Sequence, residues 1–200
     1  MTQKTIDTVL RIDSSVQRQD SVSRTLGDEI VRRLRDTYGQ VTVRRVELAD
    51  DMPHIDASWV DANLAAATQR SRLAVSDQAV ALLDSADAVV VTSPVYNFSI
   101  PSALKAWIDH VCRAGLTTRY TASGPQGLLA DRPVYLAMAS GGVAFGSAAD
   151  FASSYLRQVF GFMGLKDIRL VGTAGVASDA ETATGHLDQW LPVGAAGRVA

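Results

Sequence analysis

Short apolar runs alternate with longer amphipathic stretches along most of the chain. Four of the runs are short, mostly apolar and contain β-branched residues, a pattern typical of buried strands. These runs are Thr8–Ile12, Ala88–Thr92, Val134–Ala139 and Ile168–Val171. A fifth run, Val41–Leu48, mixes polar and apolar positions and predicts an edge strand.

The amphipathic stretches between these runs predict helices. Leu26, Ile30 and Leu34 recur at every fourth position, and Gly39 follows as a C-terminal stop. One or two helices are expected over Ala57–Ala67 and Leu73–Leu83. A further helix is expected where the apolar stripe Leu104, Trp107, Ile108 and Val111 lies, with Ser99 as N-cap and Pro101 in the first turn. Another is expected at the stripe Phe151, Tyr155, Leu156 and Val159. A final helix is expected over Asp179–Trp190.

The alternation of strand and helix predicts the fold class. It indicates an α/β protein with a five-stranded parallel sheet and helices on both faces. Right-handed crossovers favour the flavodoxin-like strand order 2-1-3-4-5, built as one domain over the 200 residues. Such sheets bind ligands beyond the carboxyl ends of their strands, at the switch point between strands 1 and 3.

The loop after the first strand is rich in hydroxyls. Residues 14–25 include Ser14, Ser15, Ser21, Ser23 and Thr25 and lead into a helix. Hydroxyls and free backbone N–H groups at a helix N-terminus bind phosphate, although a polar loop with a serine N-cap would look the same. The chain has neither a GxGxxG nor a GxxxxGK[ST] pattern, which argues against a dinucleotide-binding Rossmann site and a P-loop NTPase.

Two further loops follow the third and fourth strands. In SPVYNF, Pro94 ends the strand, and the rings of Tyr96 and Phe98 either tuck into the core or contact a ligand. In SGGVAFG, adjacent glycines allow positive φ and a close approach of backbone to a ligand, or form a plain tight turn. A ligand with a phosphate at one end and a flat ring at the other satisfies all three loops, and FMN has that shape.

Composition limits the possible binding partners and the cellular compartment. A net charge of −2 argues against a nucleic-acid or membrane partner, since both usually require a basic excess. Cys112 is the single cysteine, and the N-terminus lacks a signal-like apolar segment, so we expect a cytoplasmic protein.

Some reactive or charged residues look structural. The scattered histidines His54, His110 and His186 lack metal-ligand spacing, so no metal is expected. We expect Cys112 to be a buried inert thiol and the cluster Arg32, Arg33 and Arg35 to form a solvated helix face. The segment Leu116–Asp131, with Tyr120, reads as a long functional loop.

Three long blocks of the sequence resemble a known family. The blocks YNFSIPSALKAWIDHVCRAG, TTRYTASGPQGLL and YLRQVFGFMGLKDI are similar to those of FMN-dependent NADH-azoreductases, which are quinone reductases of the flavodoxin-like superfamily. The resemblance covers nearly the whole chain. It implies FMN as cofactor, NADH as donor (with NADPH left open), a quinone or azo compound as acceptor, and a homodimer.

The resemblance also implies roles for individual residues. The FMN phosphate would be held by Ser15, Ser21, Val22 and Ser23. One side of the flavin ring would be lined by Val95, Tyr96, Asn97 and Phe98, with the Asn97 N–H near the reactive N5 atom. The polar ring edge would meet Ala139, Ser140, Gly141 and Gly142, and the substrate pocket would be bordered by Tyr120 and Phe162.

The implied activity is a ping-pong, two-electron transfer from NADH through FMN to quinones and to azo compounds, which are cleaved to amines. No side chain is expected to act as an acid or base. Many members of the family have methionine at the position of Val95 and arginine at that of Ser140. Because serine lacks the charge of arginine, we expect a preference for neutral quinones over anionic dyes. Two alternatives remain. One is a flavodoxin-like electron carrier, which would use a strongly acidic surface to dock partners, whereas the net charge here is only −2. The other is a non-catalytic FMN-binding regulator.

Overall fold

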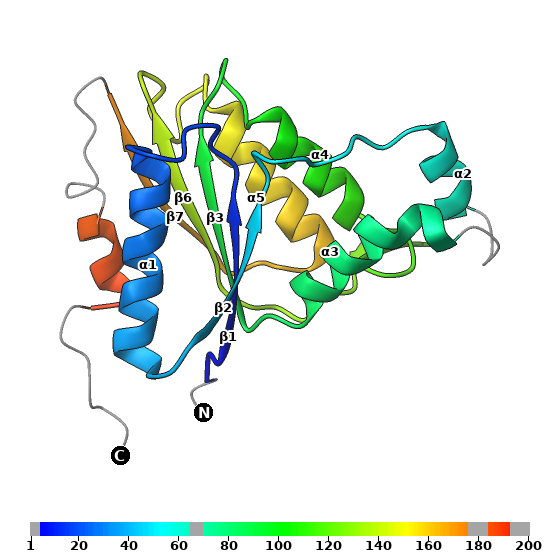
Figure 1. Cartoon of the computed structure of the whole chain (residues 1–200), viewed down its shortest axis with the longest axis horizontal. Coiled ribbons are helices and arrows are strands. Elements are labelled where there is room, and N and C mark those ends of the chain that lie inside the picture. The colour runs from blue at the N-terminus through cyan, green and yellow to red at the C-terminus, as the bar shows by residue number, and fades with distance from the viewer. Residues whose placement is uncertain (1–4, 65–69, 176–183, 193–200) are drawn as a thin grey trace.

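The sheet of the computed structural model, which describes residues 5–64, 70–175 and 184–192, has five parallel strands. Their order is β2-β1-β3-β6-β7 (Figure 1). The strands are β1 (Thr8–Asp13), β2 (Thr42–Glu47), β3 (Ala88–Pro94), β6 (Val134–Ser140) and β7 (Ile168–Ala174). Because β6 and β7 are the fourth and fifth strands of this sheet along the chain, the predicted order 2-1-3-4-5 and the edge position of β2 are confirmed.

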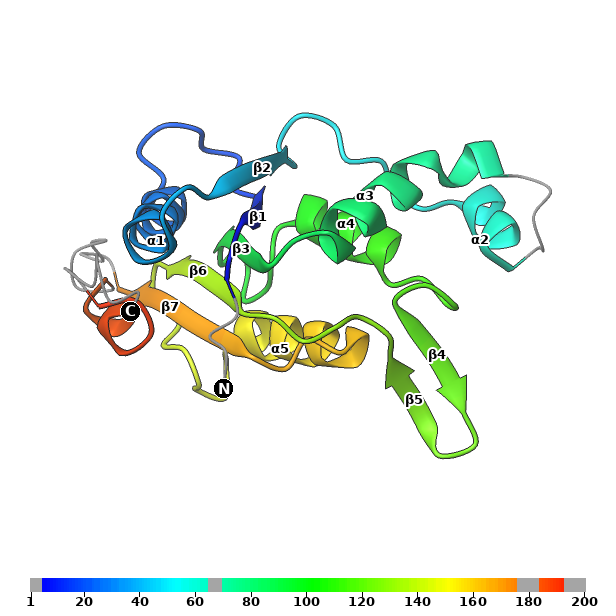
Figure 2. The same ribbon diagram turned by 90° about the horizontal axis from the view of Figure 1, so that it is seen from below.

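Helices cover both faces of the sheet (Figure 2). One face is covered by α1 (Val22–Tyr38) and the C-terminal 3₁₀ helix η2 (Gly185–Gln189). The other face is covered by α3 (Ala74–Asp84), α4 (Ser102–Val111) and α5 (Phe151–Met163). Successive strand residues point to opposite faces, and the apolar runs therefore supply two cores, one under each helical layer.

The segment before α3 forms separate short elements. Helix α2 (Ala57–Leu64) and the 3₁₀ turn η1 (Arg70–Leu73) precede α3. Residues 65–67 of the helix predicted over Ala57–Ala67 lie outside the described residues. Figure 1 shows α2 well to the side of the sheet, beyond α3.

Two helix predictions need correction. Helix α4 begins at Ser102 with Pro101 at the N-cap, because the backbone of Ser99 instead exchanges two hydrogen bonds of 2.9 Å with Tyr96. In α5 the side chain of Phe151 is 62% exposed. The fully buried positions of that helix are Ala152, Leu156, Phe160 and Met163.

Two segments differ from the predicted elements. The long loop expected over Leu116–Asp131 contains an antiparallel hairpin of β4 (Thr118–Thr121) and β5 (Gly124–Gly127), which stands out from the body in Figure 2. The helix expected over Asp179–Trp190 lies partly outside the described residues, and its described part is the short η2.

Arg33 is buried, not solvated as predicted. Its side chain reaches Glu29 at 2.7 Å, pairs with Asp188 and donates to the Leu191 carbonyl at 3.0 Å. A buried guanidinium must be paired in this way, and the pairing ties η2 to α1. Arg32 and Arg35 are exposed as expected.

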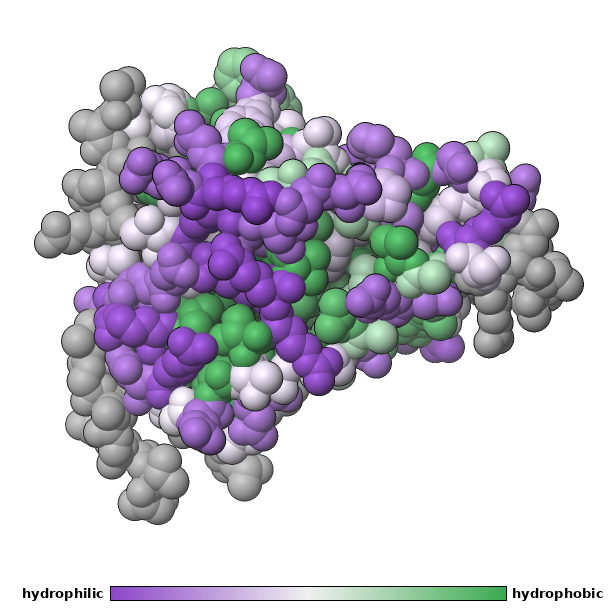
Figure 3. Space-filling model, in the orientation of Figure 1, coloured by the Kyte–Doolittle hydropathy of each residue, from purple (hydrophilic) through white to green (hydrophobic). Residues whose placement is uncertain are grey.

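The face seen in Figure 1 is mostly hydrophilic across α1 and β2, with smaller apolar patches between (Figure 3). This agrees with the polar positions of an edge strand. Of the helices that the structure describes, none is both long and apolar enough to cross a bilayer.

Candidate functional site

The three loops singled out in the sequence meet at the carboxyl edge of the sheet. The backbone N–H and the hydroxyl of Ser14 both donate to the Thr92 carbonyl, at 3.2 and 2.7 Å. The Val95 N–H donates to the Ala139 carbonyl at 2.8 Å. The loops after β1, β3 and β6 are therefore held side by side, at the switch point where such sheets bind ligands.

The loop after β1 gathers buried hydroxyls in front of α1. Ser14, Ser15, Ser21 and Ser23 are all buried, and the hydroxyls of Ser21 and Ser23 lie 3.3 Å apart. Ser21 is the N-cap residue of α1, but its side chain makes no capping hydrogen bond. The serine N-cap position is therefore present, but its hydroxyl is not used for capping. Hydroxyls and first-turn N–H groups gather at this helix N-terminus, as an anion site requires.

The loop after β3 is a tight turn in an unusual conformation. Tyr96 and Ser99 are joined by two backbone hydrogen bonds, and between them Asn97 and Phe98 have φ of 49° and 68°. Two left-handed residues define a type I′ turn, whose second position usually holds glycine. Phenylalanine there costs roughly 1–2 kcal/mol.

The rings of this turn do not tuck into the core, so that alternative is wrong. Phe98 is 56% exposed and Tyr96 is 36% exposed. A cavity of about 530 Å³ adjoins the turn, and it is lined by Tyr96, Asn97, Ser99, Ile100, Pro101, Ser102, Lys105 and Tyr155. Strained backbone and exposed aromatic rings beside a cavity are typical of a ligand-binding loop.

The loop after β6 is held by Ser140. This side chain is buried, and its hydroxyl accepts hydrogen bonds from the N–H groups of Val143 at 2.8 Å and Gly142 at 3.4 Å. The expected positive φ is absent from Gly141 and Gly142 and occurs instead at Gly146, where φ is 80°. A Cβ on Gly141 or Gly142 would meet no protein atom within 4 Å, so their backbone is open to a ligand.

The two residues predicted for the substrate pocket lie together. The rings of Tyr120, on β4, and Phe162, on α5, are 6.4 Å apart between centroids, and Tyr120 is 78% exposed. Helix α5 starts near the carboxyl edge and runs back along the sheet, so Phe162 lies roughly 17 Å along it from Phe151. Within one chain, the structure therefore places this pair apart from the three loops.

A buried charge network beneath the first loop was missed by sequence reasoning. Arg24, the third residue of α1, is 5% exposed and forms a double hydrogen bond with Glu47, at 2.7 and 2.8 Å. This bond lowers the pKa of Glu47, with the positive charge of Arg24 adding to it. A helix arginine beside serines gives no sequence signal that separates a buried role from a surface one.

Neither His110 nor Cys112 belongs to the site. His110 is buried, with Nε2 2.9 Å from the Pro53 carbonyl and its ring edge-on to Trp59. Burial raises the pKa of the Cys112 thiol to about 11, as expected for an inert thiol. Across the described part of the chain, no group of three His, Cys, Asp or Glu side chains could hold a metal ion.

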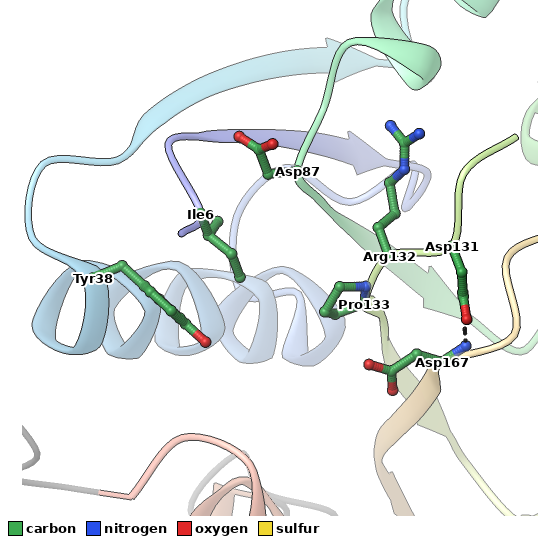
Figure 4. A pocket seen from close by; sticks show the side chains of 7 residues that line it. All are labelled: Ile6, Tyr38, Asp87, Asp131, Arg132, Pro133 and Asp167. Atoms are coloured by element: carbon green, nitrogen blue, oxygen red, sulfur yellow. Dashed lines mark hydrogen bonds between the residues drawn. The ribbon is translucent and has the colours of Figure 1, made fainter. Parts of the chain in front are cut away.

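A second hollow, of about 290 Å³, lies at the amino edge of the sheet (Figure 4). It is lined by Ile6, Tyr38, Asp87, Asp131, Arg132, Pro133 and Asp167. Its polar groups have structural partners: Asp87 accepts the N–H groups of Asp7 and Thr8, and Asp131 accepts that of Asp167. We therefore assign this hollow to the packing of strand starts.

Comparison with known proteins agrees with this geometry. Residues 7–192 match the family described by its flavodoxin-like fold. Over 180 residues the chain is 43% identical to "FMN-dependent NADH:quinone oxidoreductase 1" of Jannaschia sp. (strain CCS1), a match that covers 88% of this chain and 92% of that protein. The chain therefore belongs to the flavodoxin-like family and, within it, to the group of FMN-dependent NADH:quinone oxidoreductases.

Solved structures extend the similarity. An azoreductase from Bacillus anthracis str. Sterne superimposes with a TM-score of 0.79 at 25% identity, covering 92% of this chain and 96% of that one. A FMN-dependent NADH-azoreductase from Bacillus anthracis str. Ames Ancestor, in complex with FMN, gives a TM-score of 0.78 at 25% identity, with 95% and 98% covered.

Proposed function

We propose that the chain is an FMN-dependent enzyme that transfers two electrons from NADH to quinones and to aromatic azo compounds, cleaving the azo bond to amines. The observation that carries this proposal is the meeting of three loops at one sheet edge: buried serines, exposed rings and open glycine backbone. The similarity to a named FMN-dependent NADH:quinone oxidoreductase supports it. The two alternatives, an electron carrier and an FMN-binding regulator, would have the same fold but would not reduce quinones with NADH.

FMN fits the residues present. Four buried serines and the start of α1 suit a phosphate, which we assign to Ser15, Ser21, Val22 and Ser23. The ring side is assigned to Val95, Tyr96, Asn97 and Phe98, and the polar edge to Ala139, Ser140, Gly141 and Gly142. When bound, FMN would supply hydride transfer at its N5 atom.

The protein's own groups would bind and orient the flavin and the substrates. In this proposal the Asn97 N–H faces N5, and the N–H groups of the Gly141–Gly142 backbone stabilise negative charge at the polar edge. The rings of Tyr96 and Phe98 exclude water from one side of the flavin. NADH (or NADPH) and the acceptor would use the remaining face in turn, so we expect ping-pong kinetics, seen as parallel lines in double-reciprocal plots.

We further propose that the chain is one flavodoxin-like domain that works in the cytoplasm as a homodimer. Tyr120 and Phe162 lie apart from the three loops of their own chain, so a second copy would bring this pair to the site. Exposed Tyr120 and Phe98 would also be covered by such contact. The flavin-loaded protein should then scatter light as about twice the 21.3 kDa chain.

The decisive experiment is purification followed by cofactor identification and turnover. Heat-released cofactor should run as FMN in chromatography, and the loaded protein should consume NADH when a neutral naphthoquinone is added. Recovery of FAD or of no flavin would reject the cofactor assignment. Bound FMN without NADH-dependent quinone reduction would favour the carrier or regulator instead.

Phe98→Gly is expected to separate stability from activity. Glycine adopts φ near 68° without penalty, so the flavin-free protein should gain about 0.5–1 kcal/mol after the entropy cost of glycine. Quinone reduction should fall several-fold because the ring is lost. Urea unfolding and steady-state kinetics measure the two effects. Asn97→Gly, in the same turn, keeps the ring and should change neither strongly, while a Phe98→Gly protein of full activity would contradict the assigned role.

Ser140→Arg tests the charge departure from the family pattern. The matched control is Ser140→Ala, because both variants lose the hydroxyl that holds the loop. Relative to that control, arginine should raise kcat/KM for a sulfonated azo dye several-fold, since one partly screened charge contributes on the order of 1 kcal/mol. A neutral quinone should not distinguish the two variants. Equal responses of dye and quinone would show that charge at position 140 does not set preference.

A further inference from the structure

The loop assigned to the phosphate rests on a buried network of ionised side chains. Asp13, the last residue of β1, is fully buried and contacts Arg11 at 3.0 Å, Arg24 at 3.7 Å and also Arg45. Its carboxylate also accepts the Thr92 hydroxyl at 2.8 Å. The network therefore joins the ends of β1 and β3 to the first turn of α1.

Arg24 is the member of this network that touches the loop itself. Its Nη2 donates to the Ser15 carbonyl at 2.6 Å, while the same guanidinium forms the double hydrogen bond with Glu47 at the end of β2. The Glu47 bond also raises the pKa of Arg24, so the guanidinium stays charged. The backbone carbonyl of Arg24 is in turn held by Arg11 at 3.2 Å.

The charges of the network balance. Three guanidinium groups, of Arg11, Arg24 and Arg45, are matched by three carboxylates. The carboxylates belong to Asp13, Asp28 and Glu47. Arg24 therefore offers the loop little uncompensated positive charge, and its contribution is geometric.

That geometry bears on the N–H next to Ser15. In a planar trans peptide the C=O and N–H point in opposite directions. When Arg24 holds the Ser15 carbonyl beneath the loop, the N–H of Val16 is turned to the other side. A carbonyl turned outward would instead repel an anion.

We propose that Arg24 is a positioning residue, which fixes the Ser15–Val16 peptide so that the loop presents N–H groups to the phosphate of a phosphorylated flavin. This inference rests on the proposed FMN site and adds a cause for its choice of ligand. Arg24 does not contact the phosphate. It makes the loop selective for FMN over riboflavin, which has the same ring without the phosphate.

The test measures binding of both flavins to the flavin-free protein by fluorescence quenching. Arg24→Lys keeps the charge, but one ammonium cannot hold both the Glu47 carboxylate and the Ser15 carbonyl in the same fork. The Kd for FMN should rise about tenfold, while the Kd for riboflavin should stay within about twofold. The ratio of the two constants is the readout, since general loosening of the fold would weaken both.

The matched control is Arg33→Lys. Arg33 is as buried on α1 as Arg24 and is likewise paired with carboxylates. It lies further along α1, where it contacts η2 and not the phosphate loop. This variant should lower the thermal midpoint and leave the ratio unchanged. If Arg24→Lys does not fold, the sign of the change in Glu47→Gln decides. This variant leaves the Arg24 guanidinium uncompensated, so a role through charge would tighten FMN relative to riboflavin, whereas a positioning role, with the fork loosened, weakens FMN relative to riboflavin.

Parallel weakening of FMN and riboflavin, or no change in either, would overturn the inference. The proposed function fails differently, because an unmodified protein that binds FMN no more tightly than riboflavin shows its failure before any variant is made. Selective loss of FMN in Arg24→Lys, with an unchanged ratio in Arg33→Lys, supports the positioning role.

Discussion

Gly127→Ala is expected to push the β4–β5 hairpin away from α5 and to reduce quinone turnover at least about tenfold. A Cβ at this position would lie 2.2 Å from the Gly164 nitrogen and 2.4 Å from the Met163 carbonyl carbon. These are backbone atoms and cannot rotate aside, so the hairpin itself must shift, at a cost of about 1–3 kcal/mol. The Tyr120–Phe162 ring contact and the Leu129–Met163 hydrogen bond would be lost with it.

Gly161→Ala is the control for this change. Gly161 lies on the same helix, and its Cβ would meet no atom within 4 Å, so helix propensity alone should make the variant as stable or slightly more stable. Kinetics and light scattering on both variants separate hairpin displacement from a general effect on α5. Full turnover and dimer mass in Gly127→Ala would contradict the assignment of the hairpin to the pocket.

The sheet was predictable because its signal is local and repeated. Buried parallel strands are apolar on both faces, so runs such as Ala88–Thr92 stand out against the amphipathic helices between them. Alternation then leaves few topologies, and the observed order followed from right-handed crossovers. The three loops of the candidate site were found for the same reason, since each follows a recognisable strand.

The hairpin was missed because β4 (TRYT) has strand-favouring threonines and a tyrosine but is only four residues long, and β5 has no local signal. The sequence GPQG of β5 contains two glycines and a proline, all poor strand formers, and β5 is held by packing against α5. Long-range contact of this kind overrides local propensity. Asn97 and Phe98 are similar, because their left-handed turn is fixed by hydrogen bonds between Tyr96 and Ser99.

Sequence reasoning also failed to predict the buried arginines. Arg33 was predicted to lie on a solvated face and Arg24 was given no role, yet both are nearly inaccessible. Their partners, Glu47 and Asp188, are distant in sequence. Charge pairing between distant elements leaves no periodic pattern, so sequence reasoning assigns such residues to the surface.

The contact between α1 and the sheet gives the second large expected effect. A Cβ on Gly27 would lie 2.4 Å from Cγ2 of Thr92. Thr92 cannot turn away cheaply, because it is β-branched and its hydroxyl is bonded to Asp13 at 2.8 Å. Gly27→Ala should therefore destabilise the flavin-free protein by about 2 kcal/mol in urea unfolding, even though alanine favours helix by about 1 kcal/mol.

Removing the methyl group that clashes should reverse this effect. Thr92→Ser keeps the hydroxyl for Asp13 and deletes Cγ2, so Gly27→Ala in the Thr92→Ser background should be neutral or stabilising. The double-mutant cycle then gives a coupling of about 2 kcal/mol. A cycle without coupling would mean that α1 moves as a whole when Cβ is added. In that case Gly27→Ala should weaken FMN binding, through the Ser21 and Arg24 contacts at the start of α1, and binding should stay weak in the Thr92→Ser background. If the clash is local, FMN binding should instead recover together with stability when Cγ2 of Thr92 is removed.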